Sequence, residues 1–314
     1  MGMAGPLFAA AIFYLGACSA TEGSGDSMNG GGAGDLASAG STLGGSAVVA
    51  GAGQQLGGGG VQTGGTSGSG GNGNGVGGST SGTNGQGGAP DCTIGAMQAL
   101  PEATPARNPN DGLISIHESY KAKCAAAHPV IFVGDSLTWG WDFGGDPAGK
   151  AAFDANLAGA PYSAATFGIG GDTTQFLLWR LQDGEVDGCA PSTRVAVLLI
   201  GINNIFGGAT PANTAAGVQA NLNELRCRLP NAKILLLGLW PATNVSAQTL
   251  DQVNAALMTF ADGTNVRYLD LGADLAPSGS TTSNPNYYDG IHLTAAGYGV
   301  YAEKVKPVLD DMLK

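Results

Sequence analysis

A serine, a histidine and an aspartate in this chain could together form an activated nucleophile. Ser136 lies in the motif GDSLT (134–138), and Asp289 and His292 share the motif DGIHLT (289–294). A serine hydroxyl attacks an ester only when a base removes its proton, and a histidine is such a base when a carboxylate orients its ring. Because Asp289 and His292 are three residues apart, they can share one side of a turn. We predict that Ser136 is the nucleophile, His292 its base and Asp289 the orienting acid.

Two further motifs could bind the negative charge that develops during acyl transfer. They are GIGGDTT (168–174) and GINN (201–204). Gly171 can offer a backbone N–H because no side chain blocks its approach, and Asn203 can offer its side-chain amide. The backbone N–H of Ser136 would be a third donor, and losing one such donor typically costs about 10²–10³ in rate. We expect these three groups to form an oxyanion hole.

Five short apolar runs predict the strands that position these motifs. The runs are 129–136, 165–170, 194–201, 233–240 and 265–272, and helical spacing is found at 173–181, 210–229, 247–260 and 295–313. Because strands that alternate with helices form parallel sheets, we predict an α/β fold, a three-layer α/β/α sandwich with a central five-stranded parallel sheet. Ligands bind at the carboxyl ends of such strands, where these motifs lie.

The four motifs, in this order, resemble those of the SGNH, or GDSL, hydrolase family over nearly all of residues 128–314. Within the family, FGIGGDTTQFLLWRL (167–181) looks especially like the catalytic subunits of platelet-activating-factor acetylhydrolase Ib. The resemblance implies the flavodoxin-like SGNH hydrolase fold and the residue roles given above. It also implies a reaction that needs no metal or cofactor.

Each motif also has a simpler interpretation. GDS is common in turns, and GIGGDT could be a dinucleotide loop, although it lacks the full G-x-G-x-x-G pattern. Thr138 stands where a G-x-S-x-G elbow needs glycine, which argues against the α/β-hydrolase fold. His117 and His128 precede the first predicted strand, so we assign them no role. Trp139 and Trp141 flank the nucleophile and fit a cleft floor or core packing equally well.

The N-terminal part of the chain has a different composition. Residues 21–90 hold 28 of the 55 glycines, and no Lys or Arg precedes Arg107. Because so few apolar side chains cannot offset the entropy of ordering the backbone, we expect residues 19–90 to be a disordered tether and 91–314 to be the hydrolase domain. The net charge of −11 without a basic cluster argues against a nucleic-acid partner.

Residues 1–18 have the features of a signal peptide. The apolar run 7–17 is too short to span a bilayer but has the length of a signal-peptide core. Its end, LGAC, looks like a bacterial lipobox, which implies cleavage before Cys18 and lipid on that thiol. We therefore expect an exported lipoprotein of the bacterial cell surface or outer membrane, or alternatively a secreted protein. Its only membrane contact would be the N-terminal lipid anchor.

The remaining cysteines are Cys92, Cys124, Cys189 and Cys227, and none shows the C-x-x-C spacing of a zinc site. In an exported protein an even number of cysteines favours disulfides. We favour Cys92–Cys124 and Cys189–Cys227. Because these cysteines precede strands or end a helix that returns to one, we expect them at the edge of the sheet opposite the site.

Together these observations predict a serine esterase that hydrolyses short-chain, chiefly acetyl, esters through an acyl-enzyme. A surface-tethered enzyme would meet acetylated polysaccharides, so our first hypothesis is a carbohydrate O-acetylesterase. A lipase or lysophospholipase of the same family is the alternative. A non-catalytic surface-binding lipoprotein that has retained the fold is a hypothesis of a different class.

Overall fold

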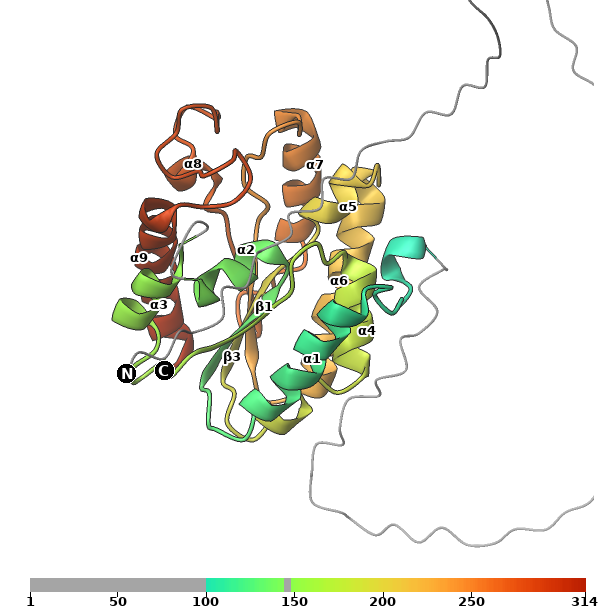
Figure 1. Ribbon diagram of the computed structural model, residues 1–314, viewed down its shortest axis with the longest axis vertical. Helices are drawn as coiled ribbons and strands as arrows, with labels where there is room; N and C mark the ends of the chain where they lie inside the picture. The colour runs from blue at the N-terminus through green and yellow to red at the C-terminus, as the bar shows by residue number, and fades with distance from the viewer. Residues whose placement is uncertain (1–99, 144–147) are drawn as a thin grey trace, which may run out of the picture. The chain divides into compact units, whose positions relative to one another are not determined.

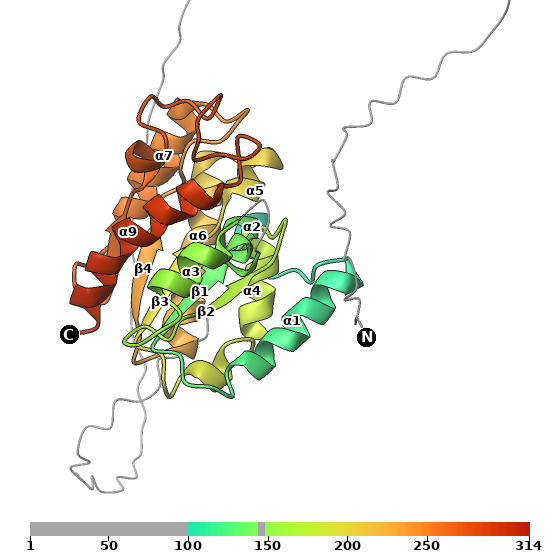
Figure 2. The ribbon, with the colours of Figure 1, turned by 60° about the vertical axis from the view of Figure 1, so that its left-hand side comes forward.

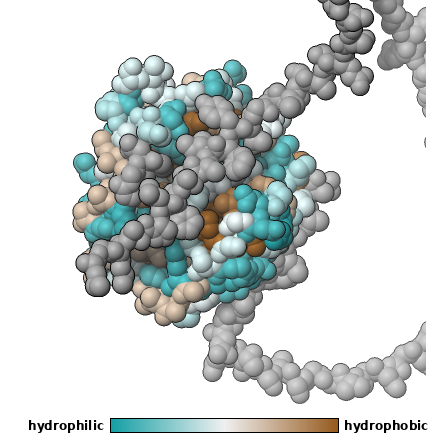
Figure 3. Space-filling model, viewed as in Figure 1, coloured by the Kyte–Doolittle hydropathy of each residue, from teal (hydrophilic) through white to brown (hydrophobic). Residues whose placement is uncertain are grey.

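The computed structural model of the protein describes residues 100–143 and 148–314. The predicted signal peptide with Cys18, the tether and Cys92 lie outside the described residues. Within the described part, no helix is both long and apolar enough to cross a membrane. The face drawn in Figure 3 is mostly hydrophilic or neutral, with hydrophobic residues confined to smaller areas.

A five-stranded parallel sheet forms the centre of the fold. Its strands are β1 (Val130–Gly134), β2 (Ala165–Gly168), β3 (Val195–Leu199), β4 (Lys233–Leu237) and β5 (Val266–Leu269). Their order is β2-β1-β3-β4-β5, and every neighbouring pair is parallel. All residues of β1, β2 and β3 are buried, as near-continuous apolar runs require in a sheet covered on both faces. The predicted α/β fold with a five-stranded parallel sheet is confirmed.

Helices cover both faces of this sheet (Figures 1 and 2). On one face lie α3 (Lys150–Asn156) and α9 (Ala295–Met312). On the other face lie α1 (Asp111–Lys123), α4 (Thr174–Gln182) and α6 (Pro211–Arg228). Helix α7 (Ala247–Met258) packs against α6. The shorter helices are η1 (Pro101–Ala103), α2 (Ser136–Trp139), η2 (Gly140–Asp142), η3 (Asp187–Cys189), α5 (Ile202–Phe206) and α8 (Gly272–Leu275). The four helices predicted from spacing correspond to α4, α6, α7 and α9.

The first strand ends earlier than its apolar run predicts. The run extends to Ser136, but β1 ends at Gly134. Asp135 then caps α2, because its side chain accepts the N–H of Leu137 at 3.0 Å. Ser136 therefore begins a helix instead of ending a strand.

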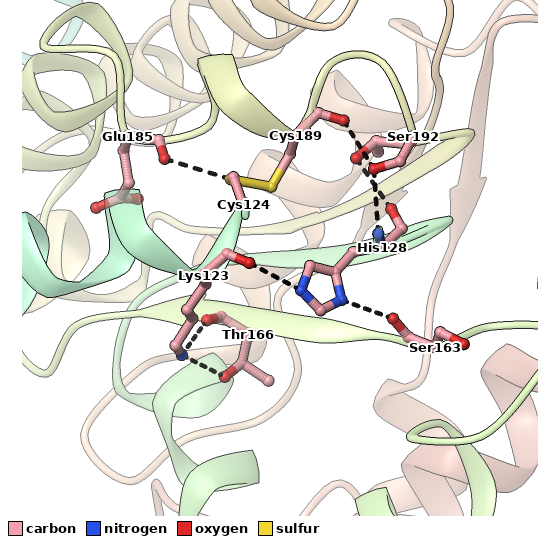
Figure 4. Close-up of a disulfide and its surroundings, with 9 residues drawn as sticks. Lys123, Cys124, His128, Ser163, Thr166, Glu185, Cys189 and Ser192 are labelled. Atoms are coloured by element: carbon pink, nitrogen blue, oxygen red, sulfur yellow. Dashed lines mark hydrogen bonds between the residues drawn. A yellow bond between two sulfur atoms is a disulfide. The ribbon is translucent and has the colours of Figure 1, made fainter. Parts of the chain in front are cut away.

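A disulfide joins Cys124 and Cys189 (Figure 4), so both predicted pairs, Cys92–Cys124 and Cys189–Cys227, are wrong. Cys124 follows α1 and leads into β1, whereas Cys189 ends η3 and leads into β3. Because β1 and β3 are neighbours in the sheet, the segments entering them meet. The spacing of the cysteines does not reveal that order. Cys227 is also disulfide-bonded.

Candidate active site

Ser136 lies at the junction between β1 and α2, at the carboxyl end of the sheet. As the first residue of α2, it carries a backbone N–H that no helical carbonyl can accept. The end of β2 packs closely against this helix. A Cβ atom on Gly168 would lie 2.2 Å from the backbone nitrogen of Trp139, so only glycine permits this approach. The helix that begins at Ser136 and the end of β2 are therefore held together.

A chain of hydrogen bonds links Ser136 to the loop before α9. His292 Nε2 lies 2.9 Å from Ser136 Oγ, and His292 Nδ1 lies 2.7 Å from Asp289 Oδ2. Because the ionised carboxylate can only accept, Nδ1 carries the proton that it donates to Asp289. Nε2 then presents its lone pair to the serine hydroxyl. The structure thus brings together the three side chains predicted to activate a nucleophile.

Asp289 is held by its own turn. Its Oδ1 accepts the backbone N–H groups of Ile291 at 2.9 Å and His292 at 2.8 Å. Burial alone would raise the pKa of Asp289, but the hydrogen bonds from His292 outweigh it and hold the pKa below its ordinary value. Asp289 is therefore ionised at neutral pH. Thr294 caps α9 directly after this turn, since its side chain accepts the N–H of Gly297.

The residues predicted as oxyanion donors adjoin the same junction. Gly171 is exposed and has a φ of +77°, a left-handed conformation that favours glycine. Among the described residues no acceptor takes the N–H of Gly171 or that of Ser136. Asn203 Nδ2 donates to the Asp172 carbonyl at 2.8 Å, which fixes its amide beside Gly171 and leaves one N–H available.

The comparisons with known proteins identify the family. Residues 132–300 match the model of the GDSL-like Lipase/Acylhydrolase family. The chain belongs to this family. It is 30% identical over 229 residues to platelet-activating factor acetylhydrolase IB subunit alpha2 of Homo sapiens, a match that covers 69% of this chain and 91% of that protein. Subunit alpha1 of Homo sapiens is 31% identical over 190 residues, a match that covers 59% of this chain and 77% of that protein. The protein is thus a carboxylic ester hydrolase, as the motifs predicted.

Two solved structures share the GDSL fold. One is a protein from Streptococcus pneumonia assigned as a platelet activating factor, with 20% identity, a TM-score of 0.51, and 63% of this chain and 95% of that chain covered. The other is a protein from Bacteroides fragilis assigned as an acylhydrolase, with 20% identity, a TM-score of 0.50, and 63% and 97% covered. At this level of identity the likeness concerns the fold alone.

A buried arginine connects the loops of this GDSL site. Arg180 is 2% exposed, and its Nε lies 2.7 Å from Asp172 Oδ2. Its Nη2 donates to the carbonyls of Gly134 at 3.1 Å and Phe167 at 3.3 Å, and its Nη1 pairs with Glu185. Burial raises the pKa of Asp172 to about 6, and the guanidinium opposes that shift. We assigned these residues no role from the sequence, although an arginine within the apolar run FLLWRL was a signal for a buried ion pair.

His117 belongs to the outer end of the same network. It is buried, with Nδ1 at 2.7 Å from Glu185 Oε2 and Nε2 at 2.9 Å from Asp183 Oδ2. Burial alone would lower its pKa, but the hydrogen bonds that its ring makes to Glu185 and Asp183 raise the pKa above its ordinary value. A cation would fit between His117, Glu118 and Asp183. The Lys121 ammonium, however, already donates to the carboxylates of Glu118 and Asp183. The geometry is that of an ion-pair network that joins α1 to α4.

The two tryptophans near Ser136 differ in environment. Trp141 is fully buried, with ring centroids of Tyr298 and Tyr301 at 4.6 and 4.8 Å, so it is a core residue. Trp139 is half-buried and packs edge-on against Phe143 at 5.1 Å. A Cβ atom on Gly170 would lie 2.7 Å from the Trp139 ring. Trp139 therefore lies against the loop that carries Gly171, whereas Trp141 does not reach a cleft.

A small apolar recess adjoins the site. It is too narrow to hold a water molecule, and it is lined by Leu137, Ile202, Leu239, Trp240, Ala242 and Ile291. Three of these residues are chain neighbours of the site: Leu137 follows Ser136, Ile202 precedes Asn203, and Ile291 precedes His292. Apolar side chains thus pack closely next to the residues that form the site.

Proposed function

We propose that the protein hydrolyses acetyl and similarly short esters of carbohydrates through Ser136, His292 and Asp289. The observation that carries this proposal is the hydrogen-bonded chain from Ser136 Oγ through His292 to Asp289. Its serine and histidine are 156 residues apart in the sequence. Such an arrangement serves little purpose in packing, because all three side chains remain partly exposed.

In the first half of the reaction, Ser136 Oγ attacks the acyl carbon while His292 Nε2 takes its proton. Asp289 stabilises the resulting imidazolium, as its lowered pKa allows. The carbonyl oxygen becomes an oxyanion, for which the N–H groups of Ser136 and Gly171 and the amide of Asn203 are the candidate donors. The carbon–oxygen bond to the alcohol then breaks, and the alcohol leaves with the proton from His292.

In the second half, water replaces the alcohol. His292, now neutral, accepts a proton from that water, and the resulting hydroxide attacks the acyl carbon of the ester on Ser136. The same donors bind the second oxyanion. Its collapse breaks the bond to Ser136 Oγ, which regains a proton from His292, and releases the carboxylic acid. No other chemical group is required to balance these steps.

The closed recess supports a short acyl group. Leu137, Ile202 and Ile291 surround a space without room for water, so a long acyl chain would have to displace side chains that are largely buried. Displacement of packed side chains costs about 1–3 kcal/mol. An acetyl group needs the least displacement.

The proposal also specifies the alcohol part of the ester. A carbohydrate fits the expected export, lipidation at Cys18 and tether, which would present the enzyme to acetylated polysaccharides. A phospholipid acetyl ester is the second candidate, favoured by the identity to platelet-activating factor acetylhydrolase subunits.

The test uses purified protein and p-nitrophenyl esters of increasing acyl length. We expect turnover of the acetate, with kcat lower by at least about 10³-fold in Ser136→Ala. Equal turnover by the wild type and this variant, or none by either, would overturn the proposal and favour a binding lipoprotein.

Shortening one wall of the recess tests the acyl limit. In Ile291→Ala we expect the ratio of butyrate to acetate kcat/KM to rise about tenfold, because the lost methylenes open space for a longer chain. Ile116→Ala, which shortens a half-buried isoleucine on α1, is the matched control and should leave the ratio unchanged. A wild-type preference for long acyl chains would contradict the short-ester assignment.

A further inference from the structure

A second, larger cavity lies beside the candidate active site. Its volume is about 680 Å³, within the range of small-molecule sites. It is formed by the segment after β4 (239–247), the first turns of α7, the segment after β5 (270–273) and the stretch 276–282. We call it the β4–β5 cavity. It opens at the carboxyl ends of two strands, the edge at which α/β sheets bind ligands.

The β4–β5 cavity is joined to the turn that carries His292. The backbone N–H of Thr243, a cavity residue, donates to the Gly290 carbonyl at 2.8 Å. A Cβ atom on Gly290 would lie 2.3 Å from Thr243 Oγ1, so the two segments are in direct contact. Leu239 and Ala242 line both this cavity and the apolar recess. One wall therefore separates the cavity from the recess.

The position of His292 decides which part of an ester faces this cavity. The departing alcohol oxygen must reach His292 Nε2 to receive its proton. The alcohol part of the ester therefore extends on the His292 side. The β4–β5 cavity adjoins that side through Gly290 and Thr243. It is thus placed to receive the alcohol part of the substrate.

The cavity wall combines small apolar surfaces with groups that bind hydroxyls. The polar side chains include the carboxylates of Asp251 and Asp270 and the amide of Asn244, with hydroxyls from the stretch 280–282. Carboxylates only accept hydrogen bonds, and the hydroxyls of a sugar can supply the donors. Apolar wall residues such as Leu250 can contact the C–H faces of a sugar ring.

Charge excludes one class of ligand from this cavity. No Lys, Arg or His is among the described residues that line it, and neither Asp251 nor Asp270 forms an ion pair within the described chain. The two carboxylates therefore repel a phosphate. A neutral polyhydroxylated ligand satisfies their acceptors without that repulsion.

We propose that the β4–β5 cavity binds the sugar whose hydroxyl carries the acetyl group, with Asp251 and Asp270 accepting hydrogen bonds from neighbouring sugar hydroxyls. This inference rests on the proposed function and specifies its substrate: a neutral, partly acetylated carbohydrate with free hydroxyls. It also predicts discrimination against acetyl esters that carry a phosphate next to the reacting ester.

The experiment compares kcat/KM on three probes: a glucose monoacetate, p-nitrophenyl acetate and platelet-activating factor. The test variant is Asp251→Asn combined with Asp270→Asn, which keeps the acceptor that Asp270 Oδ1 offers to Gly272. We expect the ratio of kcat/KM on glucose monoacetate to kcat/KM on p-nitrophenyl acetate to fall about tenfold or more, because the sugar hydroxyls lose their charged acceptors. The relative rate on platelet-activating factor should rise.

Two other variants keep the result interpretable. Ala273→Trp fills the cavity from an exposed position and should lower the same ratio without removing a carboxylate. Glu303→Gln neutralises an exposed carboxylate on α9, outside the cavity, and should leave all three rates unchanged.

The outcomes separate this inference from the proposed function. If the wild type hydrolyses p-nitrophenyl acetate through Ser136 but the ratio is the same in every cavity variant, the cavity proposal is wrong and the esterase stands. A wild type that prefers platelet-activating factor to glucose monoacetate would also overturn it, in favour of a phospholipid substrate. Absence of Ser136-dependent turnover on all probes would remove both proposals.

Discussion

Ser136 combines two roles because of its position at a helix start. The first N–H groups of a helix have no internal acceptor, and the side chain of Asp135 takes only the N–H of Leu137. The N–H of Ser136 is thus left for a ligand, while its hydroxyl points to His292 Nε2 at 2.9 Å. One residue therefore presents both a nucleophile and a donor for the charge that its attack creates.

At the same scale, Asp289 should control the rate at which His292 takes and returns the proton. Asp289→Asn keeps the shape of the side chain but removes the charge that stabilises the imidazolium, and we expect kcat on p-nitrophenyl acetate to fall about 10³–10⁴-fold. Steady-state kinetics of the two proteins measure this fall, and an unchanged kcat would contradict the pairing of Asp289 with His292.

Asp135 should make stability depend on pH. It is fully buried, and burial raises its pKa from 3.8 to about 7. A raised folded-state pKa stabilises the fold below pH 3.8, and this contribution is lost as the pH rises through about 7. Asp135→Asn keeps the acceptor for Leu137 but does not titrate. Its free energy of unfolding should therefore rise relative to wild type by up to about 1.4 kcal/mol per pH unit across that interval. Urea denaturation measures this difference in the free energy of unfolding between the two proteins. If the difference is the same at all pH values, Asp135 is not neutral in the fold.

At the scale of elements, α4 organises the site through one side chain. Arg180 extends from this helix to the carbonyls of Gly134 and Phe167, in the last residues of β1 and β2, and to Asp172 in the loop beside Gly171. A guanidinium suits this task because its five donors point in fixed directions. The loops that carry the candidate nucleophile and oxyanion donors thus share one anchor.

Replacing that anchor should affect stability and rate separately. Arg180→Met removes the buried cation that pairs with Asp172 and leaves Glu185 with His117 as its remaining partner, and we expect the free energy of unfolding to fall by about 3–5 kcal/mol. Arg180→Lys retains the charge but cannot reach every acceptor, so the loss of stability should be smaller while kcat on p-nitrophenyl acetate still falls. Urea denaturation and steady-state kinetics measure the two effects.

Arg267→Met provides the comparison for Arg180. Arg267 pairs with Asp311 at the surface, and such exposed pairs contribute about 0–1 kcal/mol. Similar losses of stability at both positions would show that the buried network does not anchor the loops.

At the scale of the whole molecule, the sheet separates chemistry from covalent reinforcement. The candidate site and the β4–β5 cavity occupy the carboxyl ends of the strands, whereas the Cys124–Cys189 disulfide lies where the chain enters β1 and β3. Parallel strands make this separation possible, because all carboxyl ends meet at one edge. A constraint at the amino ends can therefore stabilise the fold without contacting the site.

Removing this disulfide should lower stability more than activity. It closes a loop with a sequence separation of 65, for which chain entropy gives a stabilisation of about 4 kcal/mol. We expect the double variant Cys124→Ser with Cys189→Ser to show a lower Tm and an unchanged kcat/KM on p-nitrophenyl acetate at temperatures where it is folded. Loss of activity in a protein that circular dichroism shows to be folded would contradict the separation of the two edges.

The sequence by itself determined what depends on neighbouring residues. Each strand appears as an apolar run because both faces of a covered sheet must be apolar, and the longer helices appear as periodic segments between them. It also indicated Ser136, Asp289 and His292, because residue types and local spacing specify an acid, a base and a nucleophile.

The tertiary structure alone decided what depends on the order of strands and on contacts between distant segments. The order β2-β1-β3 pairs Cys124 with Cys189, which cysteine spacing did not predict. Arg180 joins two strand ends and a loop that are separate in sequence, and the β4–β5 cavity exists only where four segments meet. Periodicity records which face of an element is buried, but it carries no record of which other element covers that face.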